Sequence, residues 1–179
     1  MFNSGYVNLY RSGKLHERIE KARKLLQECQ ICPRRCKVNR LENRLVICKV
    51  GKRPKVSGYN PHFGEESPLV GVHGSGTIFI TSCNLGCVFC QNYDISHCGE
   101  GYEISIERFA HMMIELQDMG CHNINFVTPT HVVPQILEAL PMAIRDGLNI
   151  PLVYNTGGYD CVETLQLLEG VFDIYMPDF

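Results

Sequence analysis

Three cysteines fall within the eight-residue string CNLGCVFC, and their thiolates could bind a metal centre. Cys83, Cys87 and Cys90 lie close enough in the chain to hold three corners of one iron-sulfur cubane. A 4Fe-4S cluster is normally held by four cysteines, so three of them leave one iron with open coordination. S-adenosylmethionine can chelate such an iron through its amino and carboxylate groups, and an electron passed through the cluster can cleave its carbon-sulfur bond. A zinc site completed by a distant ligand and buried thiols without metal are the alternatives.

A second group of cysteines precedes the first in the chain. Its members are Cys29, Cys32, Cys36 and Cys48, within CQICPRRCKVNRLENRLVIC. The surrounding residues 29–76 are rich in glycine, proline and basic side chains, so we expect a small irregular module without much core of its own. Four thiolates suit a closed structural site that supplies folding energy, and zinc and a fully ligated 4Fe-4S cluster both fit. Unligated thiols are the third interpretation.

Ten cysteines are many for 179 residues, and in a reducing compartment metal ligation explains them better than disulfides. We expect the three isolated ones to be small buried hydrophobic residues: Cys98, Cys121 and Cys161.

The elements that must position these groups alternate between strands and helices. An amphipathic helix is predicted over 14–28. After it we predict strands over 76–82, 122–127, 151–156 and 172–179, and helices over 105–120, 131–146 and 160–170. Two prolines, Pro134 and Pro141, predict that the middle helix is split into two short pieces.

This alternation predicts an α/β fold, namely a partial TIM-like (β/α) barrel of about four parallel strands preceded by the cysteine-rich module. We divide the chain into a module over 1–75 and the partial barrel over 76–179. The chemical side chains then follow the carboxyl ends of the strands, where active groups gather in such folds: Cys83, Thr128, Asn155 and Asp178.

The cysteine string resembles the signature of the radical S-adenosylmethionine enzymes, CxxxCxxC with an aromatic residue, here Phe89, before the last cysteine. The wider string GSGTIFITSCNLGCVFCQNYDIS, with GEES upstream and YNTGGYD and DIYMPDF downstream, is similar to the branch of the pyruvate formate-lyase activating enzymes. The resemblance implies a radical-SAM barrel whose cluster cleaves S-adenosylmethionine to a 5'-deoxyadenosyl radical. That radical abstracts hydrogen from a substrate, and in activating enzymes the substrate is a glycine of a partner, a glycyl radical enzyme.

The same resemblance implies contacts to S-adenosylmethionine. Thr128, Pro129 and Thr130 occupy the place where many relatives carry a Gly-Gly-Glu stretch, and Asp178 falls where an acidic residue lies near the ribose. Asn155 and Thr156, with Met176 and Asp178, match residues that surround a monovalent cation. Because Asn155 replaces a carboxylate, we do not expect that cation. The set implied for the cofactor is Phe89, Thr128, Thr130, Asn155, Thr156 and Asp178.

Composition bears on partners and location. A formal net charge of -2 gives no basic field, so nucleic acid is not indicated as a partner. Basic residues are frequent between 34 and 44. A zinc ribbon that binds nucleic acid and a surface that attracts an acidic electron donor or a partner enzyme are the alternatives, but we interpret these basic residues as a solvated face. No apolar stretch predicts a membrane span and the N-terminus lacks a signal-peptide pattern, so a cytoplasmic protein is expected.

The resemblance also bears on the electron donor and on the length of the whole enzyme. The resemblance implies a reductant protein of the flavodoxin or ferredoxin type, and a cofactor-proximal lysine two residues after Asp178, so the chain is expected to be the N-terminal portion of a longer enzyme. The rival function is a non-catalytic iron-sulfur or zinc module for assembly or electron transfer. We expect His62, His73 and His131 to be ordinary histidines, and Gly74 and Gly76 to serve turn geometry at least as much as a cofactor.

Overall fold

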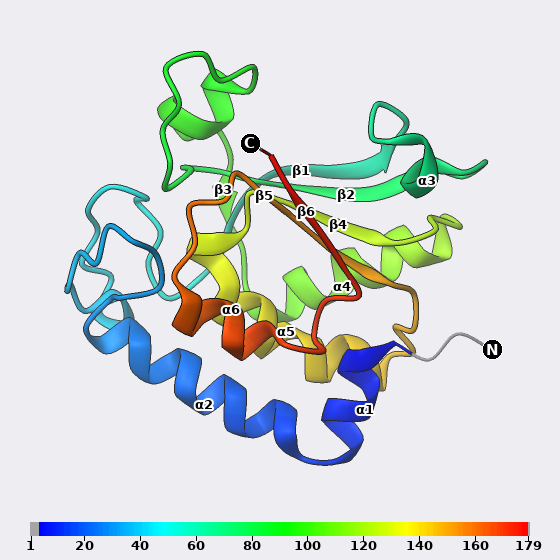
Figure 1. Ribbon diagram of the computed structural model, residues 1–179, viewed down its shortest axis with the longest axis horizontal. Coiled ribbons are helices and arrows are strands. Elements are labelled where there is room, and N and C mark those ends of the chain that lie inside the picture. The colour runs from blue at the N-terminus through cyan, green and yellow to red at the C-terminus, as the bar shows by residue number, and fades with distance from the viewer. Residues whose placement is uncertain (1–3, 179) are drawn as a thin grey trace.

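The computed structural model describes residues 4–178, and Met1–Asn3 and Phe179 lie outside the described part. Its centre is a six-stranded sheet in the order β3-β1-β2-β4-β5-β6 (Figure 1). The strands are β1 (Lys55–His62), β2 (Ser75–Ile80), β3 (Tyr102–Glu103), β4 (Ile124–Val127), β5 (Leu152–Thr156) and β6 (Ile174–Pro177). The last three pair parallel, beginning on β2, whereas β1 pairs antiparallel with both β2 and β3. The predicted α/β fold with four parallel strands is therefore confirmed.

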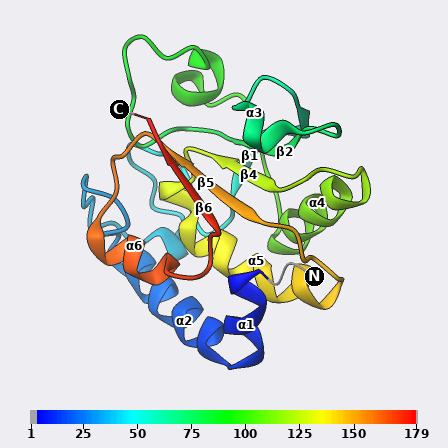
Figure 2. The same ribbon diagram turned by 45° about the vertical axis from the view of Figure 1, so that its right-hand side comes forward.

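All helices except α3, which lies in the connection between β1 and β2, cover one face of this sheet in two layers (Figures 1 and 2). The helices are α1 (Gly5–Arg11), α2 (Lys14–Gln27), α3 (Ser67–Val70), α4 (Ile106–Asp118), α5 (Val133–Arg145) and α6 (Val162–Leu168). Helix α5 contacts α4 beside it and α2 outside it. The cysteine-rich segment after α2 then loops beside the carboxyl end of the sheet.

The alternation of side chains along the strands explains this arrangement. Ile78, Phe126 and Tyr154 point toward the helices and are fully buried in the main core. Ring contacts reinforce it, since Phe126 packs edge-on against Phe109 at 6.0 Å and Phe172 at 5.8 Å between ring centres. The opposite face of the parallel strands mixes polar with apolar residues.

Two expectations about the elements were wrong. Strand β1 lies in the stretch expected to be irregular, because Gly58 and Pro61 hide a strand that pairs with the open edge of β2 and buries Val56. Helix α5 runs unbroken through Pro141, because the sheet and α2 bury it on both sides and packing overrides the lost backbone hydrogen bond. The proposed division between residues 75 and 76 falls inside β2, which pairs with both β1 and β4, and stays a prediction.

No helix among residues 4–178 is both long and apolar enough to cross a membrane.

Candidate active site at the carboxyl edge of the sheet

The candidate site is built where the parallel strands end. Phe79, Val127, Asn155 and Met176 are in register across β2, β4, β5 and β6, so the segments that follow them emerge at one edge. Backbone bonds continue past the strands, since Thr128 N donates to Asn155 O at 2.7 Å and Asp178 N to Thr156 O at 2.8 Å. The prediction that these segments meet at one edge is therefore met by their positions.

Two residues at this edge adopt a backbone conformation that side chains disfavour. Ser82, just before Cys83, has φ 61°, and Thr128, just after β4, has φ 49°. For a β-branched residue such as threonine, a positive φ is a steric outlier that the surrounding structure must hold in place. Residues held in this way are concentrated at functional sites, so both strand ends are marked independently of the cysteines.

The cysteine loop leaves β2 at this strained position. Its three thiols are partly exposed, and two of them accept hydrogen bonds: Cys83 Sγ from Leu85 N at 3.3 Å and Cys90 Sγ from Ser96 Oγ at 3.2 Å. As it stands, no set of three or more His, Cys, Asp or Glu side chains in the described chain surrounds a point where one metal ion would bind. In a cubane each thiolate binds a different iron, so its ligands stand farther apart than those of a single ion. Three thiols on one loop are a donor set that fits such a cluster.

An arginine of the first cysteine segment holds this loop. Arg34 Nε donates to Asn84 O at 2.6 Å and Arg34 Nη2 to Leu85 O at 2.9 Å. The same guanidinium lies 5.9 Å from the ring centre of Tyr159, whose carbonyl accepts from Asn84 Nδ2 at 3.4 Å. The stretch between Cys83 and Cys87 is therefore fixed from a segment some fifty positions earlier. Arg34 remains exposed while it makes these contacts. The interpretation of this basic cluster as a solvated face is wrong for Arg40, which is 2% exposed.

Asp160 accepts hydrogen bonds from three hydroxyl groups, which belong to β5 and to the segment after β4. Its Oδ1 accepts from Thr130 Oγ1 and from Tyr154 OH, each at 2.7 Å, and its Oδ2 from Thr156 Oγ1 at 2.6 Å. Burial raises the pKa of Tyr154 well above its ordinary value, and the neighbouring carboxylate adds to the shift. Tyr154 therefore stays a donor. Sequence reasoning missed Tyr154 and Asp160, although they are the first and last residues of the string YNTGGYD.

Comparison with known proteins identifies the family. Residues 77–177 match the family described as the radical SAM superfamily. The chain belongs to the radical SAM superfamily. Membership implies a 4Fe-4S cluster and S-adenosylmethionine as cofactors.

One curated relative extends the likeness across nearly the whole radical SAM chain. An uncharacterized protein of Methanocaldococcus jannaschii is 36% identical over 174 residues, which cover 90% of this chain and 48% of the relative. The chain thus spans about half the length of the curated relative it matches. No solved structure matches the chain.

The residues implied for S-adenosylmethionine lie at the carboxyl edge of the sheet but differ in how far they are exposed to solvent. Thr130 and Thr156 are buried and donate to Asp160. Their hydroxyls also accept, from Tyr154 OH at 3.3 Å and from Gly158 N at 3.1 Å, so each keeps one acceptor lone pair for a ligand. Asp178 is exposed, and Phe89 is 83% exposed beside Val88 at 91%. Thr128 and Asn155 are half-buried. Their roles at the cofactor remain predictions.

The sequence did not indicate a binding place on the face of the sheet that lies away from the helices. Asn125, in the middle of β4, is fully buried, and neither its Nδ2 nor its Oδ1 has a hydrogen-bond partner in the described structure. Glu65 lies nearby, and burial raises its pKa, with His62 opposing the shift and Asp178 adding to it. The only signal was the string GEES, which carried no assigned role. A buried unpaired amide beside a carboxyl group makes this face a place for a polar ligand.

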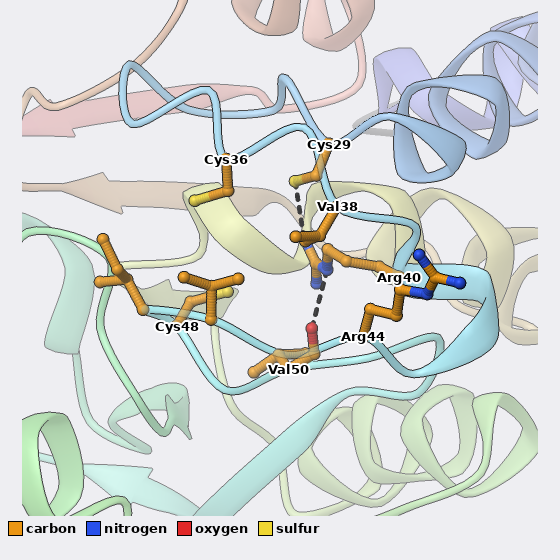
Figure 3. A pocket seen from close by; sticks show the side chains of 9 residues that line it. Cys29, Cys36, Val38, Arg40, Arg44, Cys48 and Val50 are labelled. Atoms are coloured by element: carbon orange, nitrogen blue, oxygen red, sulfur yellow. Dashed lines mark hydrogen bonds between the residues drawn. The ribbon is translucent and has the colours of Figure 1, made fainter.

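The first cysteine group forms a second cluster of thiols. Cys29, Cys36 and Cys48 line a small cavity together with Arg40 (Figure 3). Cys32 is buried nearby, and burial raises the pKa of its thiol, with Cys29 and Cys48 adding to the shift. Burial likewise raises the pKa of Cys36. The four cysteines are thus neighbours, as their spacing predicted, while their role as ligands stays a prediction.

His131 and the isolated cysteines complete the account. His131 is buried, its Nε2 donates to Thr81 O at 2.8 Å, and burial lowers its pKa to about 4, so the ring is neutral near pH 7. Cys121 and Cys161 are buried as expected. Cys98 is exposed instead, because it lies at the end of the outward π-helical turn η2 (Asp94–Cys98).

Proposed function

We propose that this radical SAM chain binds a 4Fe-4S cluster at Cys83, Cys87 and Cys90 and cleaves S-adenosylmethionine reductively. The observation that carries the proposal is the placement of a three-cysteine loop at the carboxyl edge of four parallel strands, directly after the strained Ser82. When bound, the cluster supplies the electron that splits the sulfonium into methionine and a 5'-deoxyadenosyl radical.

The residues of the chain would then bind and orient the cluster and S-adenosylmethionine. Arg34 fixes the backbone of the loop, and Asp160 fixes the hydroxyls of Thr130 and Thr156. Asp178 at the end of β6 is free to accept from ribose hydroxyls, since its carboxylate is exposed. Precise placement of this kind is what a protein contributes to a cofactor that carries the difficult chemistry.

The finer proposal is an activating enzyme similar to that of pyruvate formate-lyase. Its support is the set of strings quoted above, and its partners would be a reductant protein of the flavodoxin or ferredoxin type and a glycyl radical enzyme. The exposed Val88 and Phe89 at the tip of the cysteine loop offer an apolar contact for such a partner. The proposal also includes a second metal, zinc or another 4Fe-4S cluster, at Cys29, Cys32, Cys36 and Cys48.

The test uses the 179-residue chain reconstituted anaerobically with iron and sulfide. We expect about four irons at the Cys83 loop and an electron paramagnetic resonance signal of the reduced cluster that shifts when S-adenosylmethionine is added. With dithionite and S-adenosylmethionine, 5'-deoxyadenosine should form.

The matched variants are Cys87→Ser and Cys98→Ser. Loss of a ligand should bring 5'-deoxyadenosine down to the protein-free background, whereas removal of the exposed Cys98 should leave its formation unchanged. A complete cluster whose signal ignores S-adenosylmethionine would favour the non-catalytic iron-sulfur module instead.

A further inference from the structure

Arg40 is a buried cation without a carboxylate partner. It is 2% exposed, and its guanidinium donates to three carbonyls: Val50 O at 2.8 Å, His131 O at 2.8 Å and Gly51 O at 3.4 Å. Within residues 4–178 no ion pair includes it. Its remaining contact is Cys29 Sγ, 3.8 Å from Nη1.

Carbonyl oxygens solvate this guanidinium but cannot neutralise it. A buried charge is costly unless an opposite charge accompanies it, and arginine does not give up its proton in proteins. Of the atoms it contacts, only the sulfur of Cys29 can become an anion. The position of Arg40 therefore calls for negative charge in the cysteine group.

Figure 3 shows where that charge would reside. Cys29, Cys36 and Cys48 surround a cavity of about 10 Å³, with Arg40 at its border and Val38 and Val50 closing it. Four cysteines with no open position are the ligand set of a closed structural zinc site. The sulfurs do not yet enclose one point at binding distance, so the thiols must turn inward to bind.

The segment also has little apolar core of its own to hold its shape. Its own apolar cluster contains three buried residues, Leu26, Cys29 and Ile31. So small a core supplies little stability, and small irregular modules are commonly held by a structural metal.

We propose that Cys29, Cys32, Cys36 and Cys48 bind one thiophilic divalent ion of the zinc class, and that Arg40 is the internal counter-cation of this centre. The inference rests on the proposed second metal and goes beyond it by choosing a single ion and assigning its charge partner. Four thiolates around a divalent ion leave two net negative charges, and Arg40 balances one of them without contact to solvent.

The first experiment is metal analysis of the whole chain purified anaerobically and then reconstituted. We expect about one zinc per chain in addition to about four irons, with Cys36→Ser losing the zinc and, in the absence of a chelator, keeping the iron. Additional iron in place of zinc, or no metal lost in Cys36→Ser, would overturn the inference. The separate behaviour of S-adenosylmethionine at the iron cluster decides the proposed function, so the two can fail independently.

The second experiment tests the charge partner. Arg40→Gln is compared with Arg44→Gln, because Arg44 lines the same cavity but its side chain is 71% exposed and pairs with Glu42 at 3.4 Å. We expect a chromogenic chelator to remove zinc at least about tenfold faster from Arg40→Gln, since loss of an outer partner typically costs 10- to 100-fold in metal affinity. Equal release from both variants would refute the role of Arg40.

A third measurement keeps the test valid if Arg40→Gln does not fold. In a chain with all four cysteines replaced by serine, the guanidinium has no anion to balance. Arg40→Met should then lower the unfolding midpoint in urea by less than it does in the chain with its cysteines. An equal shift in both backgrounds would show that Arg40 and the cysteines are not coupled.

Discussion

Replacement of Arg34 by glutamine is expected to loosen the iron cluster without unfolding the chain. The substitution removes two charged hydrogen bonds, to Asn84 O and Leu85 O, from the stretch between the first two cluster cysteines. Such bonds contribute about 1.5–3 kcal/mol each, or about 3–6 kcal/mol for two, and the exposure of Arg34 to solvent reduces the sum to about 2–3 kcal/mol. At 1.4 kcal/mol for each factor of ten, the loop should lose its cluster roughly 30- to 150-fold more readily.

The assay follows the loss of cluster absorbance after an iron chelator is added under anaerobic conditions. Arg35→Gln is the matched control, because the neighbouring Arg35 reaches Glu163 at 3.4 Å and is half-exposed. The paramagnetic resonance signal of the reduced cluster should also change in Arg34→Gln and stay as in the wild type in Arg35→Gln. If both variants lose iron at the wild-type rate with an unchanged signal, Arg34 does not position the loop.

Two further predictions concern stability. A methyl group at Gly76 would stand 2.7 Å from Asn123 O and 3.1 Å from Cys121 Cβ, so Gly76→Ala should lower the free energy of unfolding by about 1–3 kcal/mol. Gly58→Ala meets nothing within 4 Å and should stay within about 0.5 kcal/mol of wild type in urea titrations; equal losses would refute the close approach. The pKa of His131 is lowered in the folded chain from 6.5 to about 4, so its contribution is complete above pH 6.5 and falls as the pH drops toward 4. Between pH 7 and 5 wild type should lose about 2 kcal/mol more than His131→Gln, and identical pH profiles would show that His131 does not titrate in this way.

The sequence predicted the parallel part of the sheet because its signals are local. Runs such as GTIFITS and HNINFV alternate with helices whose apolar stripes are plain, and each strand end is followed by a polar string. Strand β1 was not predicted, because its pairing with β2 and not its own residues makes this segment a strand. Helix α5 kept Pro141 for the same reason, since neighbours on both sides stabilise it.

Within the site, spacing brought the cysteines to attention but could not reveal what supports them. Asp160 and Tyr154 belong to no spacing rule, and their meeting with Thr130 depends on two strand ends that fold side by side. Arg34 and Arg40 stand in a run of basic residues whose simplest interpretation is a solvated face. Their partners lie 50 and 91 positions away, at Asn84 and His131, and only the folded chain joins them.

These two arginines give the first cysteine group a mechanical connection to the second. Arg34 holds the loop after Cys83 directly, and Arg40 holds the carbonyl of His131, whose ring donates to Thr81 O two residues before Cys83. Both arginines lie between cysteines of the first group, in a segment with a very small core of its own. Under the proposed metal assignment, loss of that metal should free both arginines and thereby loosen the iron-binding loop from either side. Loss of the iron leaves the first group's ligands and Arg40 in place, so the dependence should run in one direction.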